Sequence, residues 1–202
     1  MISKSYLEKQ YLLNKQSVFE ISQKLACSEN KVNYWLAKHD IKKRSRSESA
    51  YIKANPKGDP FEKRTLKSHN DWFLYGLGLG LFWGEGNKVN KHAVRLGNTD
   101  PDLILKFIEF LEVIYSIDRK KLRFGLQIFT DINVNEALTF WQKKLGVNKN
   151  YFYKVLITKS HSKGTYRKKS KYGVVTVYFS NVKLRDSIIT AIDELRGENL
   201  PT

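Results

Sequence analysis

The residues that could do chemistry lie in a glycine-rich apolar stretch, residues 75–86, that ends in a carboxylate. Gly76, Gly80 and Gly84 recur every fourth residue, so in a helix they would lie on one face and leave it without side chains. Each helix-interior glycine costs about 1 kcal/mol relative to alanine, and close packing against a second helix would offset that cost. Glu85 would stand at the C-terminal end of the helix, where the dipole disfavours a carboxylate. This placement suggests a bound divalent metal ion; the alternative is a core helix whose last side chain faces water.

Residues 78–86, GLGLFWGEG, resemble the LAGLIDADG motif of the homing endonucleases. The resemblance extends over about residues 72–197. It departs from the motif twice, because Gly78 replaces the opening leucine and Trp83 replaces the first acidic residue.

The resemblance implies a homodimer, since one motif copy supplies one helix and one acid. Gly76, Gly80 and Gly84 would form the contact between the two copies. Glu85, with the backbone carbonyl of Gly84 beside it, would bind Mg²⁺ above the scissile phosphates. Each chain would then read one half of a partly palindromic site in double-stranded DNA.

Further catalytic residues are also implied by the resemblance. The family places a polar residue at a strand end and a basic residue before the last helix. Asn98 takes the first position, although a turn or helix-capping role is the alternative for it. Lys183 is the nearest cation to the second position, and Lys154 and Lys159 remain open as substitutes.

The charge balance points to a polyanionic partner. Lys and Arg number 36 against 20 Asp and Glu, for a formal net charge of +16, which favours nucleic acid. A basic protein of the ribosomal kind is the alternative. The single cysteine excludes an internal disulfide, and no stretch of about 20 apolar residues occurs, so we expect a cytoplasmic protein in a reducing compartment with no membrane contact.

The N-terminal residues 1–46 have the pattern of a helix-turn-helix domain. Ser17 and Ser28 are capping residues for two helices separated by a short break. The segment resembles the small helix-turn-helix modules found beside many phage and mobile-element endonucleases; a three-helix bundle for protein contacts is the alternative. The residues expected at DNA are, on the second helix, Asn30, Lys31, Asn33 and Tyr34, and on the following basic arm, Lys42, Lys43, Arg44 and Arg46.

The rest of the chain predicts an α+β domain. Residues 47–70 lack periodicity and contain prolines, so we expect a basic linker without a helix. Residues 71–202 alternate helices and strands, which predicts an antiparallel sheet backed by helices, similar to the homing-endonuclease fold. The expected helices cover residues 71–85, 101–116, 134–145 and 182–195, and the expected strands residues 93–96, 122–128, 151–158 and 172–179.

Two further surfaces are expected to contact DNA. The polar face of the sheet would present Arg95, Arg123 and Gln127, with Lys91 and Lys154. The cationic loop between the last two strands would reach phosphates, unless it is only a solvated loop, through Lys159, Lys163, Arg167, Lys168 and Lys169.

Two functions fit these patterns. The first is a site-specific, Mg²⁺-dependent DNA endonuclease, a phosphodiester hydrolase acting as a homodimer. The second is a non-catalytic DNA-binding transcriptional regulator on the same fold. Glu85 favours the nuclease, whereas Trp83 and the unassigned catalytic lysine favour the regulator.

Overall fold

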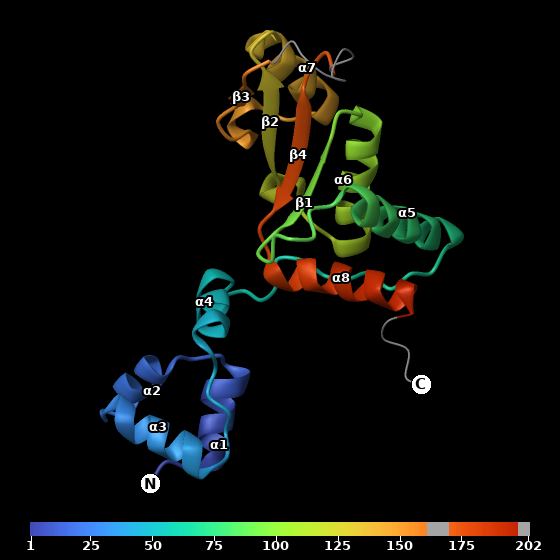
Figure 1. The fold of residues 1–202 in the computed structure, drawn as a ribbon. Coiled ribbons are helices and arrows are strands. Elements are labelled where there is room, and N and C mark those ends of the chain that lie inside the picture. The colour runs from blue at the N-terminus through green and yellow to red at the C-terminus, as the bar shows by residue number, and fades with distance from the viewer. Residues whose placement is uncertain (161–169, 198–202) are drawn as a thin grey trace. The chain divides into compact units, whose positions relative to one another are not determined.

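The computed structural model describes residues 1–160 and 170–197 (Figure 1). The chain divides into two compact units, Met1–Pro60 and Phe61–Thr202. Each unit has its own hydrophobic core. The first is helical and the second combines helices with a four-stranded sheet, so the predicted α+β class is confirmed.

The first unit packs short helices around a small core. Its elements are α1 (Lys4–Leu7), the π-helical turn η1 (Glu8–Leu13), α2 (Val18–Lys24), α3 (Glu29–Lys38) and α4 (Arg46–Ala54). The predicted capping box at α2 is present: the Glu20 amide donates to Ser17 Oγ at 3.1 Å, and the Ser17 amide donates to Glu20 Oε2 at 2.7 Å. Ile21 of α2 packs against Val32 and Leu36 of α3 in this core.

Residues 47–70 correct the expectation of a helix-free linker. α4 occupies the first part of this stretch and begins with a second capping box, in which the Glu48 amide donates to Ser45 Oγ at 3.1 Å. None of the residues of α4 is buried, so local capping rather than a core specifies it. The last part of the stretch belongs to the second unit, because Phe61 and Leu66 pack against its core.

The second unit contains a mixed sheet rather than the predicted antiparallel one. Its elements are α5 (His69–Glu85), β1 (Val94–Asn98), α6 (Pro101–Tyr115), the 3₁₀ turn η2 (Arg119–Lys121), β2 (Arg123–Phe129), α7 (Val134–Leu145), the 3₁₀ turn η3 (Lys149–Tyr151), β3 (Leu156–Thr158), β4 (Val174–Phe179) and α8 (Val182–Arg196). The strand order is β1-β4-β2-β3, with β4 antiparallel to both neighbours and β3 parallel to β2. The predicted antiparallel pairing is wrong at β3. The helix α7 connects β2 to β3 and returns the chain to the starting end of β2, so the two strands run parallel.

The core of the second unit lies on one face of this sheet. Alternate residues of β4, Val175, Val177 and Phe179, point into it, while Thr176 and Tyr178 lie on the other face. Helices α5, α6 and α8 lie beside the sheet (Figure 1), and together with α7 they supply apolar side chains to this core. The sheet therefore leaves one face for other contacts.

The start of α5 is capped by the carboxylate of Asp71, which accepts hydrogen bonds in its charged form. The amides of Ser68 and Lys67 donate to Asp71 Oδ2 at 3.0 and 3.1 Å, and the Asp71 amide donates to Ser68 Oγ at 3.1 Å. The amide bonds, foremost that from Ser68, hold the pKa of Asp71 below its ordinary value of 3.8.

We expect Asp71→Asn to lower the melting temperature near neutral pH and to have no such effect in strong acid. A lowered folded-state pKa stabilises the protein above the unfolded pKa, and this contribution is lost as the pH falls through the folded value. Thermal unfolding over a pH series measures it. A difference between wild type and variant that stays constant into acid would contradict the assignment.

Candidate pairing face and nucleic-acid interface

One face of α5 is apolar and exposed along the helix. It consists of Trp72, Phe73, Gly76, Gly80, Trp83 and Gly84, here named the α5 face, with exposures of 59% for Trp72, 64% for Phe73 and 41% for Trp83. A Cβ added at any of its three glycines would meet no atom within 4 Å. Gly78 lies on the opposite side of the helix, where an added Cβ would be 2.1 Å from the Phe110 ring. The described part of this unit thus leaves the α5 face bare, while Gly78 is the glycine that serves the unit's own core.

Trp83 belongs to this face rather than to the acidic site. It follows Gly80 by three residues, which places both on the same side of a helix. The guanidinium of Arg196 lies 5.1 Å from the centre of the Trp83 ring. Trp83 is therefore one of the aromatic residues of the α5 face.

Glu85 is the last residue of α5 and is exposed. The next residue, Gly86, turns into an extended conformation (φ −71°, ψ 144°) and forms a β-bridge with Leu96 of β1. A Cβ on Gly86 would lie 2.3 Å from the Phe82 carbonyl oxygen, so only glycine fits here. The helix end, and Glu85 with it, is therefore fixed to the edge strand of the sheet.

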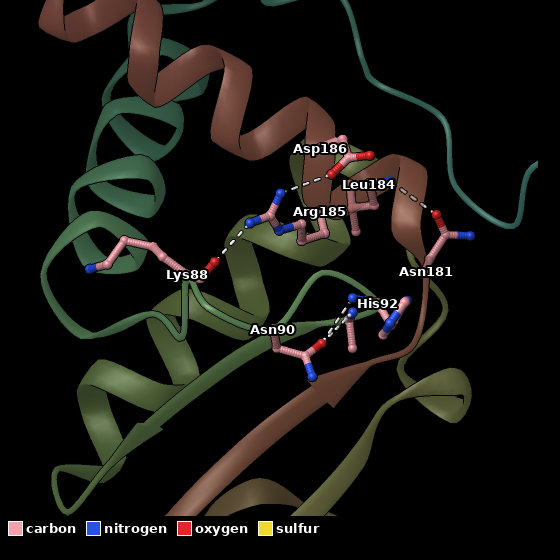
Figure 2. A network of polar contacts seen from close by, with 8 residues as sticks. Lys88, Asn90, His92, Asn181, Leu184, Arg185 and Asp186 are labelled. Carbon is pink, nitrogen blue, oxygen red and sulfur yellow. Dashed lines mark hydrogen bonds and ion pairs between the residues drawn. The ribbon is translucent and has the colours of Figure 1, made fainter.

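Two cationic residues that sequence reasoning missed hold the loop behind this helix end. Lys88 Nζ donates to the Trp83 carbonyl at 2.6 Å, which puts a cation where the α5 dipole favours one. Arg185 of α8 donates through Nη2 to the Lys88 carbonyl at 2.8 Å (Figure 2). A lysine just past a helix end is a recognisable C-terminal signal, whereas a contact spanning 97 residues leaves no local pattern.

The remaining catalytic candidates come from three different elements. Asn98 Oδ1 accepts the amides of Thr99 at 2.7 Å and Asp100 at 3.0 Å, which is the turn role left open for it. Lys154 is exposed and precedes β3, at the sheet edge opposite β1. Lys183 is exposed in the first turn of α8.

A metal ion at Glu85 would need ligands beyond those that the described residues bring together there. Within residues 1–160 and 170–197, no three His, Cys, Asp or Glu side chains come together. The Glu85 carboxylate and the Gly84 carbonyl are oxygen donors of the kind Mg²⁺ prefers, so they fit such an ion in part. The rest of its shell would come from water, phosphate or a second copy of the chain.

The open face of the sheet carries three of the five polar residues predicted for it. Arg95, Arg123 and Gln127 all lie on it, and the Arg95 guanidinium lies 5.2 Å from the ring centre of Tyr178, which sequence reasoning did not name. Arg123 donates to two nearby backbone carbonyls, and Gln127 Nε2 donates to Thr158 Oγ1 at 3.2 Å. The face is thus cationic and pre-ordered.

The predicted DNA residues of the first unit are mostly exposed. Asn30, Lys31 and Tyr34 of α3 face solvent, as do Lys42, Lys43 and Arg46 of the basic arm. Asn33 is half-buried and its Oδ1 is buried, which corrects its expected place on the outward front. In the second unit Lys159 is exposed, while Lys163, Arg167, Lys168 and Lys169 lie outside the described residues.

Arg44 has a structural task instead of the expected phosphate contact. Its guanidinium lies 4.0 Å from the ring centre of Tyr11 and donates to the Lys15 carbonyl at 2.9 Å and to the Gln16 carbonyl. Its amide donates to Tyr11 Oη at 2.8 Å. Arg44 therefore ties the basic arm to the turn before α2.

Arg44→Ala and Lys43→Ala should have different effects. Arg44→Ala should destabilise the first unit by about 1.5–3 kcal/mol, the value of hydrogen bonds made by a charged donor. Lys43→Ala should leave the melting temperature unchanged and reduce the slope of log affinity for DNA against log salt by about 1. Thermal unfolding and a salt series on both variants measure this. Equal melting temperatures for both would contradict the role given to Arg44.

Comparisons with protein-family models, with curated proteins and with solved structures give no match for this chain. In the part of the chain that the structure describes, no helix is long and apolar enough to cross a membrane.

Proposed function

We propose that the chain is a DNA-binding protein that pairs with a second copy through the α5 face and cuts both DNA strands with a divalent metal ion at the two Glu85 carboxylates. This is the activity of the LAGLIDADG endonucleases that the sequence resembles. The observation that carries the proposal is the bare, apolar α5 face, which no described residue of the unit's own core covers.

The exposed residues of α5 favour pairing with a second helix. Exposed aromatic rings and three glycines in register are costly on a solvent face, since the rings are hydrated and the glycines weaken the helix. A second α5 related by a twofold axis would bury both and could approach closely over the glycines. The resemblance to the LAGLIDADG motif implies that the same axis brings the two Glu85 side chains near each other, at the ends of the paired helices.

DNA is the partner that the charge supports. The formal net charge is +16, and exposed cations lie on both units. Arg95 and Arg123 on the open sheet face, and Lys31 on α3, suit phosphates and base edges. Both units would then contribute to affinity, which should fall steeply as salt rises.

The chemistry follows from the end of α5. A divalent ion, when bound, would stabilise the attacking and leaving oxygens of an in-line displacement at phosphorus. Glu85 and the Gly84 carbonyl would hold that ion. The Lys88 ammonium, already at the end of α5, would lie beside the same phosphate. The fixed bridge at Gly86 would keep these groups in place relative to the sheet.

A selection from a randomised-site plasmid library tests this proposal. The purified protein is incubated with the library in Mg²⁺, and the cut ends are sequenced. The expected result is double-strand cutting at a partly palindromic site. Tight binding without cutting in Mg²⁺, Mn²⁺ or Ca²⁺ would reject the nuclease.

A DNA-binding transcriptional regulator is the second candidate. It is favoured by the state of the polar groups near Glu85: Asn98 is engaged in a turn, and Lys88 is engaged with the end of α5. The same library experiment separates the two, because a regulator would enrich a bound sequence and cut none.

A further inference from the structure

Arg185 is an unusual residue for its position on α8. Its side chain is 14% exposed, although it lies in the first turn of a surface helix. Nη1 pairs with Asp186 Oδ1 at 3.0 Å and Nη2 donates to the Lys88 carbonyl at 2.8 Å. Its Nε is buried, with no hydrogen-bond partner among the described residues. Burying a guanidinium costs free energy, which the ion pair with Asp186 and the hydrogen bond to the Lys88 carbonyl offset.

That carbonyl belongs to the loop of residues 87–93, named here the α5–β1 loop. The second half of the loop holds itself: Asn90 Oδ1 accepts the amides of His92 at 3.0 Å and Ala93 at 2.9 Å (Figure 2). The first half is held by Asn87, whose amide donates to the Arg95 carbonyl at 2.8 Å and whose Oδ1 accepts the Asn90 amide at 3.0 Å, while Val89 is 90% exposed and supplies no apolar anchor. The bond from Arg185 adds a contact from α8 at the Lys88 carbonyl, inside this turn.

Lys88 is consequently held at both of its ends. Its main chain is held from α8 through Arg185, and its ammonium is held on α5 at the Trp83 carbonyl. Glu85 lies in the short segment between these two attachments. A change at Arg185 would therefore reach Glu85 and the Lys88 ammonium without touching either directly.

We propose that Arg185 is a positioning residue that fixes the Lys88 carbonyl and thereby keeps the Lys88 ammonium and the Glu85 carboxylate in the arrangement that meets a DNA phosphate. The phosphate contact rests on the proposed function. The contact between Arg185 and the Lys88 carbonyl, here named the clamp, does not depend on it. Arg185 touches neither substrate nor metal; it acts through the α5–β1 loop.

Hydrogen exchange on the full chain tests the clamp independently of activity. In Arg185→Ala, the Asn90 amide, which donates to Asn87 Oδ1 across Lys88, should exchange about tenfold faster, as expected when a local opening becomes easier. Arg185→Lys should restore most of the protection, since a lysine can still donate to a carbonyl. Asp186→Ala removes the other partner of the guanidinium and should leave the loop unchanged. Unchanged exchange in Arg185→Ala, or faster exchange spread equally through α6, would overturn the clamp.

Cleavage of the selected DNA site tests the consequence. Arg185→Ala should raise the Mg²⁺ concentration for half-maximal cutting about tenfold, while DNA affinity in Ca²⁺ stays within about twofold. Arg185→Lys should lie near wild type in both. Equal Mg²⁺ requirements in wild type and Arg185→Ala would overturn the positioning role. If wild type cuts no DNA, the proposed function fails, and the exchange result alone decides the clamp.

Discussion

Gly80→Glu should yield a folded monomer. The new side chain would point away from the unit's own core, since a Cβ at Gly80 meets nothing within 4 Å. In a twofold pair it would place two unpaired carboxylates in an apolar contact, and an uncompensated buried charge costs about 3–5 kcal/mol. The dissociation constant of the dimer should rise by at least about a hundredfold, at about 1.4 kcal/mol for each tenfold. Sedimentation velocity over a concentration series measures the change.

Gly78→Ala is the matched control on the same helix. Its methyl group would need the space of the Phe110 ring, 2.1 Å away, so we expect overpacking to destabilise the fold by about 1–3 kcal/mol. The two variants should therefore separate assembly from folding. Gly80→Glu should lose the dimer and keep its melting temperature at low protein concentration, whereas Gly78→Ala should have a lower melting temperature. A Gly80→Glu protein that still dimerises as wild type does would mean that the α5 face is not the contact.

Glu85→Gln should abolish cleavage and keep binding. The amide is nearly isosteric but supplies no charge to a divalent ion, so single-turnover cutting of the selected site should fall at least about 10²–10³-fold. DNA affinity should remain or rise slightly, because one negative charge per chain is removed from a phosphate-facing site. Quenched-flow cleavage and a binding titration on one DNA duplex measure both.

Glu136→Gln controls for the change of charge alone. Glu136 is exposed on α7, away from α5 in the chain, and its substitution by Gln changes the net charge by the same amount. It should cut at the wild-type rate. If Glu85→Gln also cuts at that rate, the metal role of Glu85 is wrong, even if the protein pairs and binds DNA as proposed.

The features predicted well from sequence are those with a local cause. The capping box at Ser17, the helix ending at Glu85 and the bare ridge that starts at Gly76 depend on residues within one or two turns of each other. A glycine ridge shows by spacing alone which side of a helix is free of side chains. It could not show that Gly78 is the one facing the core, because that depends on Phe110 of another helix.

The features missed depend on long-range contacts or on competing local signals. The parallel β3 follows from how α7 returns the chain, which spacing does not encode. In the sequence, Arg44 looks like any other cation of the basic arm. Its structural role depends on Tyr11, whose ring centre lies 4.0 Å from the guanidinium. Arg185 and Lys88 are far apart in the chain. Ser45 and Glu48 have the spacing of a capping box and could have indicated α4. The prolines that follow instead led to the prediction of a linker without a helix.

Disulfide trapping at the α5 face tests the central claim most directly. Cys27 is the sole cysteine, so Cys27→Ser gives a background in which Gly76→Cys, Gly80→Cys and Gly84→Cys are each introduced alone. A disulfide requires Cα atoms within about 7 Å, which a glycine-lined helix crossing allows. Lys143→Cys on α7 is the exposed control. We predict rapid oxidation to a covalent dimer at one or more of the three glycine positions and not at Lys143. Failure of all three to cross-link above the control would contradict pairing through α5.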